Sequence, residues 1–358
     1  MPINSFKIKS KLSDYTVEYI DIKTILNKLD ATKDIYIVDS NIYLMYMDSL
    51  FKYFNQDRII VIEAIEENKT IFYAIRQIEI IMKYGISKNT RIVSFGGGIV
   101  QDLSGFIASI LYRGLTWIYF PTTLLAQTDS CIGAKTSINH IQYKNLLGTF
   151  YNPSEVYIIP YFLNTLEIND YLSGIGELVK LQLIGGKDSF NHVLTKKDDL
   201  LERNIDSIND LISEALQIKK KFIEIDEFDK GIRNILNYGH CIGHAIESTT
   251  DYSIPHGQAV SLGMILANRL AVNIQDLDIH LAKKIEHEIL IPIVSENFRK
   301  THISKNGLIE AMKRDKKRVN SNLVVVYLKS DWTMFKNINV LIDDVEEIVD
   351  AWNLEQKY

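Results

Sequence analysis

The stretch 91-RIVSFGGGIVQD-102 joins a short run of β-branched and aromatic residues to three glycines and the start of an apolar helical pattern. This order predicts a strand that turns directly into a helix. Glycines let a ligand approach the backbone closely, and the free N–H groups at a helix start favour phosphate. The stretch therefore predicts a nucleotide site. It lacks the GxGxxG spacing, so a glycine turn with a purely structural role stays an alternative.

Short strand-like runs and helical patterns alternate around this stretch in the first half of the chain. The runs cover 34–40, 58–64, 116–122 and 156–160, and an amphipathic helix is predicted over 69–85. Such alternation predicts a parallel sheet with helices on its faces. Asp39 and Asn41 lie at the end of the first run, where they could contact the ribose or adenine of a dinucleotide. The alternative is that both residues only form a turn.

The second half of the chain has helical periodicity instead, as in 206–225 and 257–274, and only 322–328 is predicted to be a late strand. We therefore expect two domains, an α/β domain over 1–165 and a mostly α-helical domain over 166–358. The charge run 313–318 is read as a solvated face.

The composition limits the classes of protein to which the chain can belong. A chain of 358 residues with 46% hydrophobic and 24% charged residues is typical of a soluble globular protein. Its net charge of -5 argues against nucleic acid or an anionic membrane as a partner. Two cysteines without a CxxC spacing fit a reducing compartment. The chain has neither a signal-peptide pattern nor an apolar run near the roughly 20 residues of a membrane span, so we expect it in the cytoplasm.

Three of the eight histidines are close together in the sequence. In 237-NYGHCIGHAIES-248, His240 and His244 are four residues apart and therefore lie on one helical face, and His256 follows in 255-PHGQAV-260. This grouping favours a metal or acid/base site, with simple packing as the alternative. A zincin helix would need glutamate where Cys241 stands, which argues against a metalloprotease.

A catalytic zinc site usually has three protein ligands and one open position. The obvious carboxylate is Glu177 in 173-SGIGELVKLQL-183, where the glycines suggest a helix start. The alternative is that Glu177 only complements the helix dipole.

Several cations occur in apolar or glycine-rich settings, where each alone is explained as a surface charge. Together with Asn145, Asn237 and the histidines they would line an anion pocket, which suits a substrate with a phosphate and a carboxylate. The cations are Arg113, Lys135, Lys144, Lys180, Lys219 and Arg233.

Seven motifs follow one another between about residues 35 and 320: GGGIVQDLSGFIA, YRG, PTTLLAQTDSCIGAKTSINH, KNLLGTFYNP, GELVK, GIRNILNYGHCIGHAIE and PHGQAV. In this order and spacing they resemble 3-dehydroquinate synthase, within the sugar phosphate cyclase group. The resemblance implies a Rossmann-like NAD-binding domain, here over 1–165, followed by a helical metal- and substrate-binding domain, here over 166–358. It also implies a homodimer.

The resemblance implies a role for each matching residue. Glu177, His240 and His256 would bind zinc or cobalt, while His244 would face the substrate phosphate and the proton transfers. Arg113 would reach a phosphate across the dimer interface. The other substrate and catalytic positions would be Asp129, Lys135, Asn145, Lys180, Lys219, Arg233, Asn237 and one of Lys316 or Lys317. NAD would contact Asp39, Asn41, Glu66, Lys69, Gly96, Gly97, Gly98, Asp102, Thr122, Thr123, Lys135, Lys144 and Thr165.

The reaction implied by the resemblance converts 3-deoxy-D-arabino-heptulosonate 7-phosphate into 3-dehydroquinate and phosphate, with transient oxidation by NAD, elimination, reduction and aldol closure. Three alternatives stay open: a sister cyclase acting on sedoheptulose 7-phosphate or glucose 6-phosphate, a metal-dependent polyol dehydrogenase, and a non-catalytic NAD-binding protein.

The chain departs from the family pattern at three places. IEENKT replaces the usual GExxK start. Ala134 stands where glycine is usual, so its methyl group is expected to reshape the pocket beside Lys135. Gln258 stands where glutamate is usual, and is expected to alter the groups that orient His256.

Overall fold

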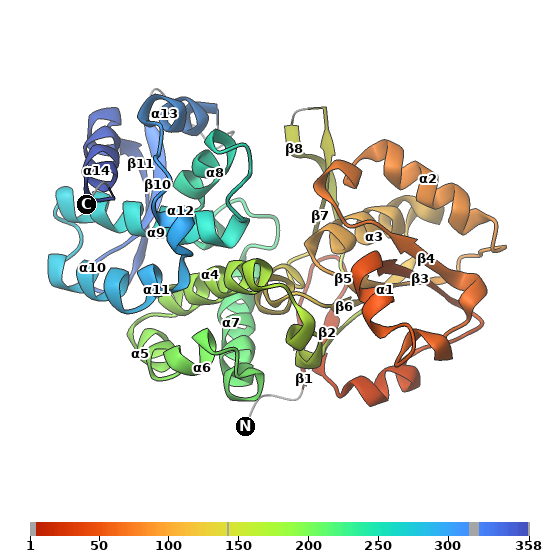
Figure 1. Ribbon diagram of the computed structural model, residues 1–358. Helices are drawn as coiled ribbons and strands as arrows, with labels where there is room; N and C mark the ends of the chain where they lie inside the picture. Colours follow the sequence, from red (N-terminus) through yellow and green to blue (C-terminus); the bar gives the residue numbers. More distant parts are fainter. Residues whose placement is uncertain (1–4, 142, 315–321, 357–358) are drawn as a thin grey trace. The chain divides into compact units, whose positions relative to one another are not determined.

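The computed structural model describes residues 5–141, 143–314 and 322–356 (Figure 1). The chain divides into two compact units. The first comprises Met1–Leu166 and Ile223–Phe228, and the second comprises Glu167–Phe222 and Asp229–Tyr358. The short segment Ile223–Phe228 is tied to the N-terminal residues, because the backbone N–H groups of Lys9 and Lys11 donate to the carboxylates of Glu224 and Glu227.

The first unit is built on a seven-stranded sheet with the order β1-β2-β9-β6-β5-β3-β4. All neighbouring strands are parallel except β1 and β2, so the expected parallel α/β fold is confirmed. The strands are β1 (Ser5–Ile8), β2 (Tyr15–Tyr19), β3 (Asp34–Asp39), β4 (Ile59–Ile62), β5 (Arg91–Gly96), β6 (Thr116–Pro121) and β9 (Glu155–Ile158).

Helices cover both faces of this sheet. One face packs against α1 (Ser40–Tyr46) through an aromatic core in which Phe95 and Phe120 stack with ring centroids 4.3 Å apart. The other face carries α3 (Gly98–Ile110), whose Gly105 lies against Trp117. The helix α2 (Ile71–Met82) packs beside α3. Strands buried on both faces show nearly continuous apolar sequence, which is why they were recognisable.

A two-stranded antiparallel hairpin of β7 (Lys135–His140) and β8 (Tyr143–Phe150) packs on α3. The sequence did not predict it, nor did it predict β1 and β2. The reason is visible in β8, where seven of eight residues are exposed and no buried face gives the sequence an alternating pattern.

The second unit is mostly helical, as expected (Figure 1). Its helices are α4 (Ile168–Ile184), α5 (Lys187–Thr195), α6 (Lys197–Leu201), α7 (Ile205–Ile225), α8 (His240–Thr249), α9 (His256–Asn273), α10 (Ile279–Ile285), α11 (Ile291–Ile293), α12 (Glu296–Arg299), α13 (Lys305–Arg314) and α14 (Ile342–Glu355).

The expectation of a single late strand was wrong. The strand β10 (Leu323–Leu328) pairs antiparallel with β11 (Met334–Val340). Only Val340 of β11 is fully buried, so its sequence carries little of the apolar pattern that marks a strand. In the part of the chain that the structure describes, no helix has the length and apolar character to cross a membrane.

Candidate metal and nucleotide sites

The candidate metal site depends on a close crossing of α4 and α9. A Cβ atom placed on Gly176 would lie 2.2 Å from the carbonyl oxygen of Gly257, and one placed on Gly257 would lie 1.8 Å from the carbonyl oxygen of Ser173. The glycines therefore let two backbones touch, and the Gly257 N–H donates to Ser173 Oγ at 2.8 Å. This contact holds Glu177 close to His256, the first residue of α9.

The position of Glu177 corrects one expectation. The helix α4 starts at Ile168, so Glu177 lies in its interior and cannot complement the dipole of the helix N-terminus. Its side chain is only 1% exposed. A buried carboxylate costs free energy unless cations or donors surround it, and Lys180 Nζ lies 2.5 Å from Glu177 Oε2.

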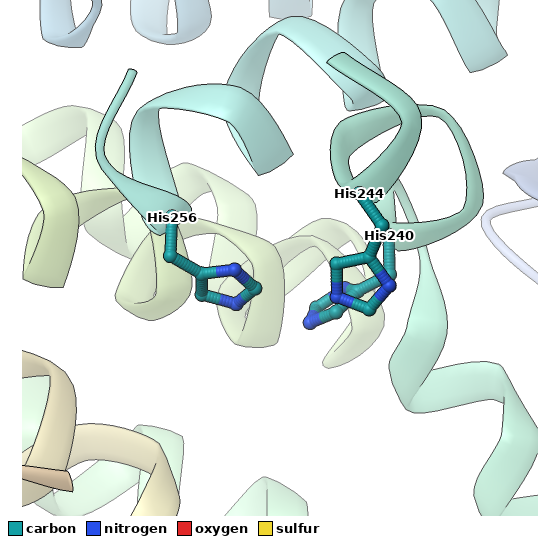
Figure 2. Close-up of side chains that lie close together, drawn as sticks. All are labelled: His240, His244 and His256. Atoms are coloured by element: carbon teal, nitrogen blue, oxygen red, sulfur yellow. The ribbon is translucent and has the colours of Figure 1, made fainter. Parts of the chain in front are cut away.

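Three histidine rings lie close together (Figure 2). His240 and His244 project from α8, and each of the three rings lies 5.3 to 5.5 Å from the other two between centroids. Their potential ligand atoms lie within 4.8 Å of one another. Glu177 Oε1 is 3.4 Å from His240 Nε2 and 3.3 Å from His256 Nε2. The residues that the sequence singled out thus form one cluster with the chemistry of a metal site.

The two histidines nearest Glu177 differ in their pKa. Burial lowers the pKa of His240 well below its usual value, and the charges of Lys180, His244 and His256 lower it further. Burial also acts to lower the pKa of His256, but hydrogen bonds to Glu177 and Glu247 outweigh it and raise the pKa to about 10. Burial thus favours the neutral, metal-binding form of His240, whereas the two glutamates favour the protonated form of His256.

Sequence reasoning missed Glu247, which lies 3.1 Å from His256 Nδ1 through its Oε2 atom. His240 has a comparable partner, because its Nδ1 lies 3.2 Å from the Tyr238 carbonyl oxygen. Both rings are thus held at Nδ1 and turn Nε2 towards Glu177. A signal was present in the sequence, since residues 240, 244 and 247 are spaced to share one helical face.

The predicted substrate cations of this unit are nearly buried. Lys219 on α7 and Arg233 on the 3₁₀ helix η8 (Ile232–Asn237) are 7% and 4% exposed, and Asn237 ends η8. The elements α4, α7 and η8 share an apolar core that includes Leu181, Ile218 and Leu236, which places these polar residues in adjacent turns. Lys316 and Lys317 lie outside the described residues.

The candidate nucleotide site lies at the carboxyl ends of β3, β5 and β6. In the registers of these strands Val38 lies beside Phe95 and Gly96 beside Pro121, so Asp39, Gly96 and Pro121 end their strands at one level, and Gly97 and Thr122 follow directly. The chain runs from β3 outward to β4 but from β5 to β6 on the other side. Such a switch point is where open α/β sheets bind ligands.

The three glycines that run from the last residue of β5 to the first residue of α3 differ in what they do. A Cβ atom on Gly96 would collide with Val100, and one on Gly97 would lie 2.9 Å from Thr123 Cγ2. A Cβ atom on Gly98 would meet nothing within 4 Å. Only Gly98, the first residue of α3, therefore borders open space, and the N–H groups of this helix start are suited to a pyrophosphate.

A hydrogen-bonded network joins four more of the predicted residues. Lys69 Nζ lies 2.5 Å from Asp102 Oδ2 and donates to Asn145 Oδ1 at 2.7 Å. Asn139, which was not predicted, donates to Glu66 Oε1 at 2.7 Å.

Ser137, also not predicted, donates its N–H to Asp102 Oδ1 at 2.9 Å. Its hydroxyl also reaches Asn145 and Asp102. These two β7 residues were missed because the hairpin itself was missed.

The remaining predicted residues of the first unit are placed as follows. Asp129 is in the π-helix η6 (Ala126–Ser130), Lys135 and Lys144 are exposed on the hairpin, and Thr165 bonds the Tyr46 hydroxyl at 3.0 Å. Asp39 accepts from Asn41 N–H at 2.8 Å and so also caps α1. Arg113 is exposed in a turn where Tyr112 and Arg113 both have positive φ, 50° and 66°.

Two departures from the family pattern have a structural account. Ala134 is buried with φ at 64°, a left-handed conformation that glycine adopts at lower cost. Gln258 is fully buried, donates to the Ile293 carbonyl at 2.8 Å and accepts from Ser295 N–H at 2.8 Å. An ionised glutamate could not make the first of these bonds. The partner of His256 is Glu247 instead.

Comparison with known proteins agrees with this picture. The family model described as 3-dehydroquinate synthase N-terminal matches residues 59–173, and the model described as 3-dehydroquinate synthase C-terminal matches residues 174–318. A 3-dehydroquinate synthase of Thermoanaerobacter pseudethanolicus is 34% identical over 304 residues, which cover 84% of this chain and 85% of that protein. One of Clostridium tetani is 38% identical over 281 residues, covering 75% and 74%.

Solved structures share the fold. A 2-deoxy-scyllo-inosose synthase complexed with carbaglucose-6-phosphate, NAD+ and Co2+ superimposes with a TM-score of 0.82 at 24% identity, over 97% of this chain and 99% of that one. A glycerol dehydrogenase of Schizosaccharomyces pombe gives 0.62 at 14% identity, over 95% and 89%. These likenesses show the architecture alone. The family models and the sequence relatives cover most of the chain, and on them the chain belongs to the 3-dehydroquinate synthase family.

Proposed function

We propose that this chain converts 3-deoxy-D-arabino-heptulosonate 7-phosphate into 3-dehydroquinate and phosphate, with one bound zinc or cobalt ion and with NAD recycled in every turnover. The observation that carries the proposal is the cluster of Glu177, His240 and His256 beside buried cations, in a chain of this family. The first domain (1–165) would bind NAD, and the second (166–358) would bind the metal and the substrate.

The metal ligands would be Glu177, His240 and His256 rather than the three histidines. Glu177 Oε1 lies within 3.4 Å of Nε2 on both His240 and His256, and a carboxylate so placed is a suitable third ligand. His244 is the exposed member of the group. A carboxylate with two imidazoles leaves an open coordination position, at which a bound metal would polarise a substrate hydroxyl as a Lewis acid.

The surrounding residues would hold the ion and the substrate in place. Lys180 occupies Glu177 Oε2 and so directs Oε1 towards the histidines. His244 would hold or pass a proton at the substrate phosphate. Lys219 and Arg233 are nearly buried cations of the kind that a substrate carboxylate and phosphate would neutralise.

The open space at Gly98 and the N–H groups of α3 support NAD as the cofactor of the first unit. NAD supplies a hydride acceptor and donor, so that the net oxidation over one turnover is zero. The chain's part is to bind the pyrophosphate at α3 and to present Asp39 and the residues around Lys69 at the same edge of the sheet.

A homodimer in the cytoplasm completes the proposal. Arg113 would reach a substrate phosphate of the neighbouring subunit from its exposed turn. The positive φ angles of Tyr112 and Arg113 cost free energy, and such strain is often kept where a side chain must be aimed. The two cysteines, Cys131 and Cys241, are both free thiols, in keeping with a reducing compartment.

The substrate is tested by phosphate release from the purified protein with NAD and zinc. The heptulosonate phosphate should react roughly a hundredfold faster than sedoheptulose 7-phosphate or glucose 6-phosphate, because its carboxylate adds charge-assisted hydrogen bonds with the predicted cations that the other two substrates cannot make. Faster turnover of either of these two sugar phosphates would refute the assignment. Accumulation of NADH in step with product would instead indicate a dehydrogenase.

The ligand set is tested by metal analysis of two variants. His256→Ala should lose most of its metal, whereas His244→Ala should keep its metal and lose rate. Equal metal loss in both would favour the three-histidine set, and full retention in His256→Ala would refute the proposed ligands.

A further inference from the structure

We infer that Lys69 and Ser137 are positioning residues that fix the side-chain amide of Asn145, so that its NH2 group, and not its oxygen, faces the substrate. The inference rests on the proposed function and on the contact with the substrate that the family resemblance implies for Asn145. It adds a role for Ser137, and it states which atom of Asn145 recognises the ligand.

The backbone of Asn145 is held first. Asn145 has a left-handed φ of 51°, and its N–H donates to Asn139 Oδ1 at 2.9 Å. Asn139 is 8% exposed, and its own N–H donates to the Lys69 carbonyl at 2.7 Å. Its side-chain NH2 group donates to Glu66. The turn that carries Asn145 is thus pinned to the segment that carries Lys69.

The side-chain amide is then oriented by two donors. Lys69 Nζ lies 2.7 Å from Asn145 Oδ1, and Ser137 Oγ lies 2.8 Å from the same atom. A lysine ammonium can only donate, so the atom that faces it must be the amide oxygen. Both lone pairs of this oxygen are used, and the NH2 group is left for a ligand.

The hydroxyl group of Ser137 donates its hydrogen bond to one acceptor. The hydroxyl has one hydrogen and two possible acceptors, Asn145 Oδ1 at 2.8 Å and Asp102 Oδ2 at 3.1 Å. Asp102 Oδ2 is already paired with Lys69 at 2.5 Å, and Asp102 Oδ1 accepts the Ser137 N–H. The hydroxyl therefore serves Asn145, while Asp102 holds Lys69 in place.

The orientation of the Asn145 amide determines which ligand atoms it can bind. An amide that offers two N–H groups suits a phosphate, carboxylate or hydroxyl oxygen. Because the selection depends on orientation, loss of Ser137 should matter only while Asn145 is present. That dependence separates a positioning role from general loosening of the hairpin.

A double-mutant cycle on KM and kcat for the heptulosonate phosphate tests the inference. Ser137→Ala should raise KM by about threefold to tenfold, the effect of one hydrogen bond. In an Asn145→Ala background the same change should raise it less than twofold. Asn145→Asp should raise KM more than Asn145→Ala, since it turns a donor into an anion. The affinity for NAD should stay within twofold in Ser137→Ala.

The control is Thr149→Val, which removes a hydroxyl from the same hairpin, where Thr149 bonds Thr136 at 2.7 Å. Its effect should add to that of Asn145→Ala. Additivity for Ser137→Ala as well, or an Asn145→Asp variant that equals Asn145→Ala, would overturn the inference.

A readout without substrate keeps this test separate from that of the proposed function. The side-chain NH2 signals of Asn145, assigned with Asn145→Ala, should shift in the nitrogen-15 NMR spectrum of Ser137→Ala but not in that of Thr149→Val. Unchanged signals in Ser137→Ala would refute the orientation whatever the substrate is.

Discussion

At the scale of single residues, the ring of His256 is held from both sides. Glu247 bonds Nδ1 at 3.1 Å, and Glu177 lies 3.3 Å from Nε2. A carboxylate on the far nitrogen of a metal-binding histidine fixes the tautomer and makes the ring a better ligand. The Nδ1 atom of His240 contacts a backbone carbonyl oxygen rather than a carboxylate. Glu247 is therefore the side chain that substitution can remove without touching the proposed ligands.

Glu247→Ala should weaken metal binding by about tenfold to a hundredfold, because the ring of His256 loses both its orientation and the neighbouring negative charge. Glu247→Gln should fall between this variant and the parent, since the amide oxygen still accepts a hydrogen bond. The measurement is the Kd for Co2+ on metal-stripped protein, by competition with a chelating dye.

Glu286→Gln is the matched control, because Glu286 is also a buried glutamate of the second unit, paired with Arg269 at 2.5 Å. It should lower the Tm and leave the Kd unchanged. A Kd for Glu247→Ala within twofold of the parent would show that Glu247 does not support His256.

At the scale of elements, the crossing of α4 and α9 decides whether the site exists. Protein interiors are close-packed, so a helix pair that meets at backbone distance cannot accept even one methyl group without moving apart. Glu177 follows directly after Gly176, and His256 directly precedes Gly257. Any separation of the helices is therefore passed on to the distance between the two side chains.

Gly176→Ala should lower the free energy of unfolding by about 1 to 3 kcal/mol, the usual cost of overpacking, and should weaken metal binding as well. The added Cβ would lie 2.2 Å from the Gly257 carbonyl oxygen. Chemical denaturation and the Co2+ Kd measure the two effects. Gly98→Ala makes the same change in open space and should alter neither; normal stability of Gly176→Ala would mean that the crossing tolerates a side chain.

At the scale of the whole molecule, the two units carry different proposed ligands. The candidate metal-binding residues lie on α4, α8 and α9 of the second unit, whereas the glycine turn and the Lys69 network belong to the first. A ligand that binds only the folded state stabilises the elements it holds together.

Hydrogen exchange read by mass spectrometry should therefore separate the two ligands. Zinc should slow exchange in α4, α8 and α9, and a chelator should reverse this. NAD should slow exchange in β5, α3 and the β7–β8 hairpin, and this protection should be lost in Gly98→Ala. If zinc slows exchange in the second unit of His256→Ala as much as in the parent protein, the proposed ligand set is wrong.

The sequence carried enough information for much of the molecule. Buried strands such as β3, β5 and β6 are apolar along their length, and the long helices have a regular apolar period, so the confirmed fold class could be predicted. The histidines could be found because two of them share a helical face. The order of the motifs was specific enough to indicate the family, and the family models confirm it.

By itself, then, the sequence determined the α/β and helical halves, the family and the grouping of Glu177 with the histidines as candidates. Only the tertiary structure decided that Gly176 and Gly257 make a helix crossing, that Glu247 supports His256, and that Ser137 and Lys69 orient Asn145. The physical reason is that sequence periodicity is local, whereas the contacts that build the site are not. Periodicity reports which face of an element is buried, whereas these contacts join groups on different elements, some of them as far apart in sequence as Lys69 and Asn145, and local pattern does not say which of these groups meet.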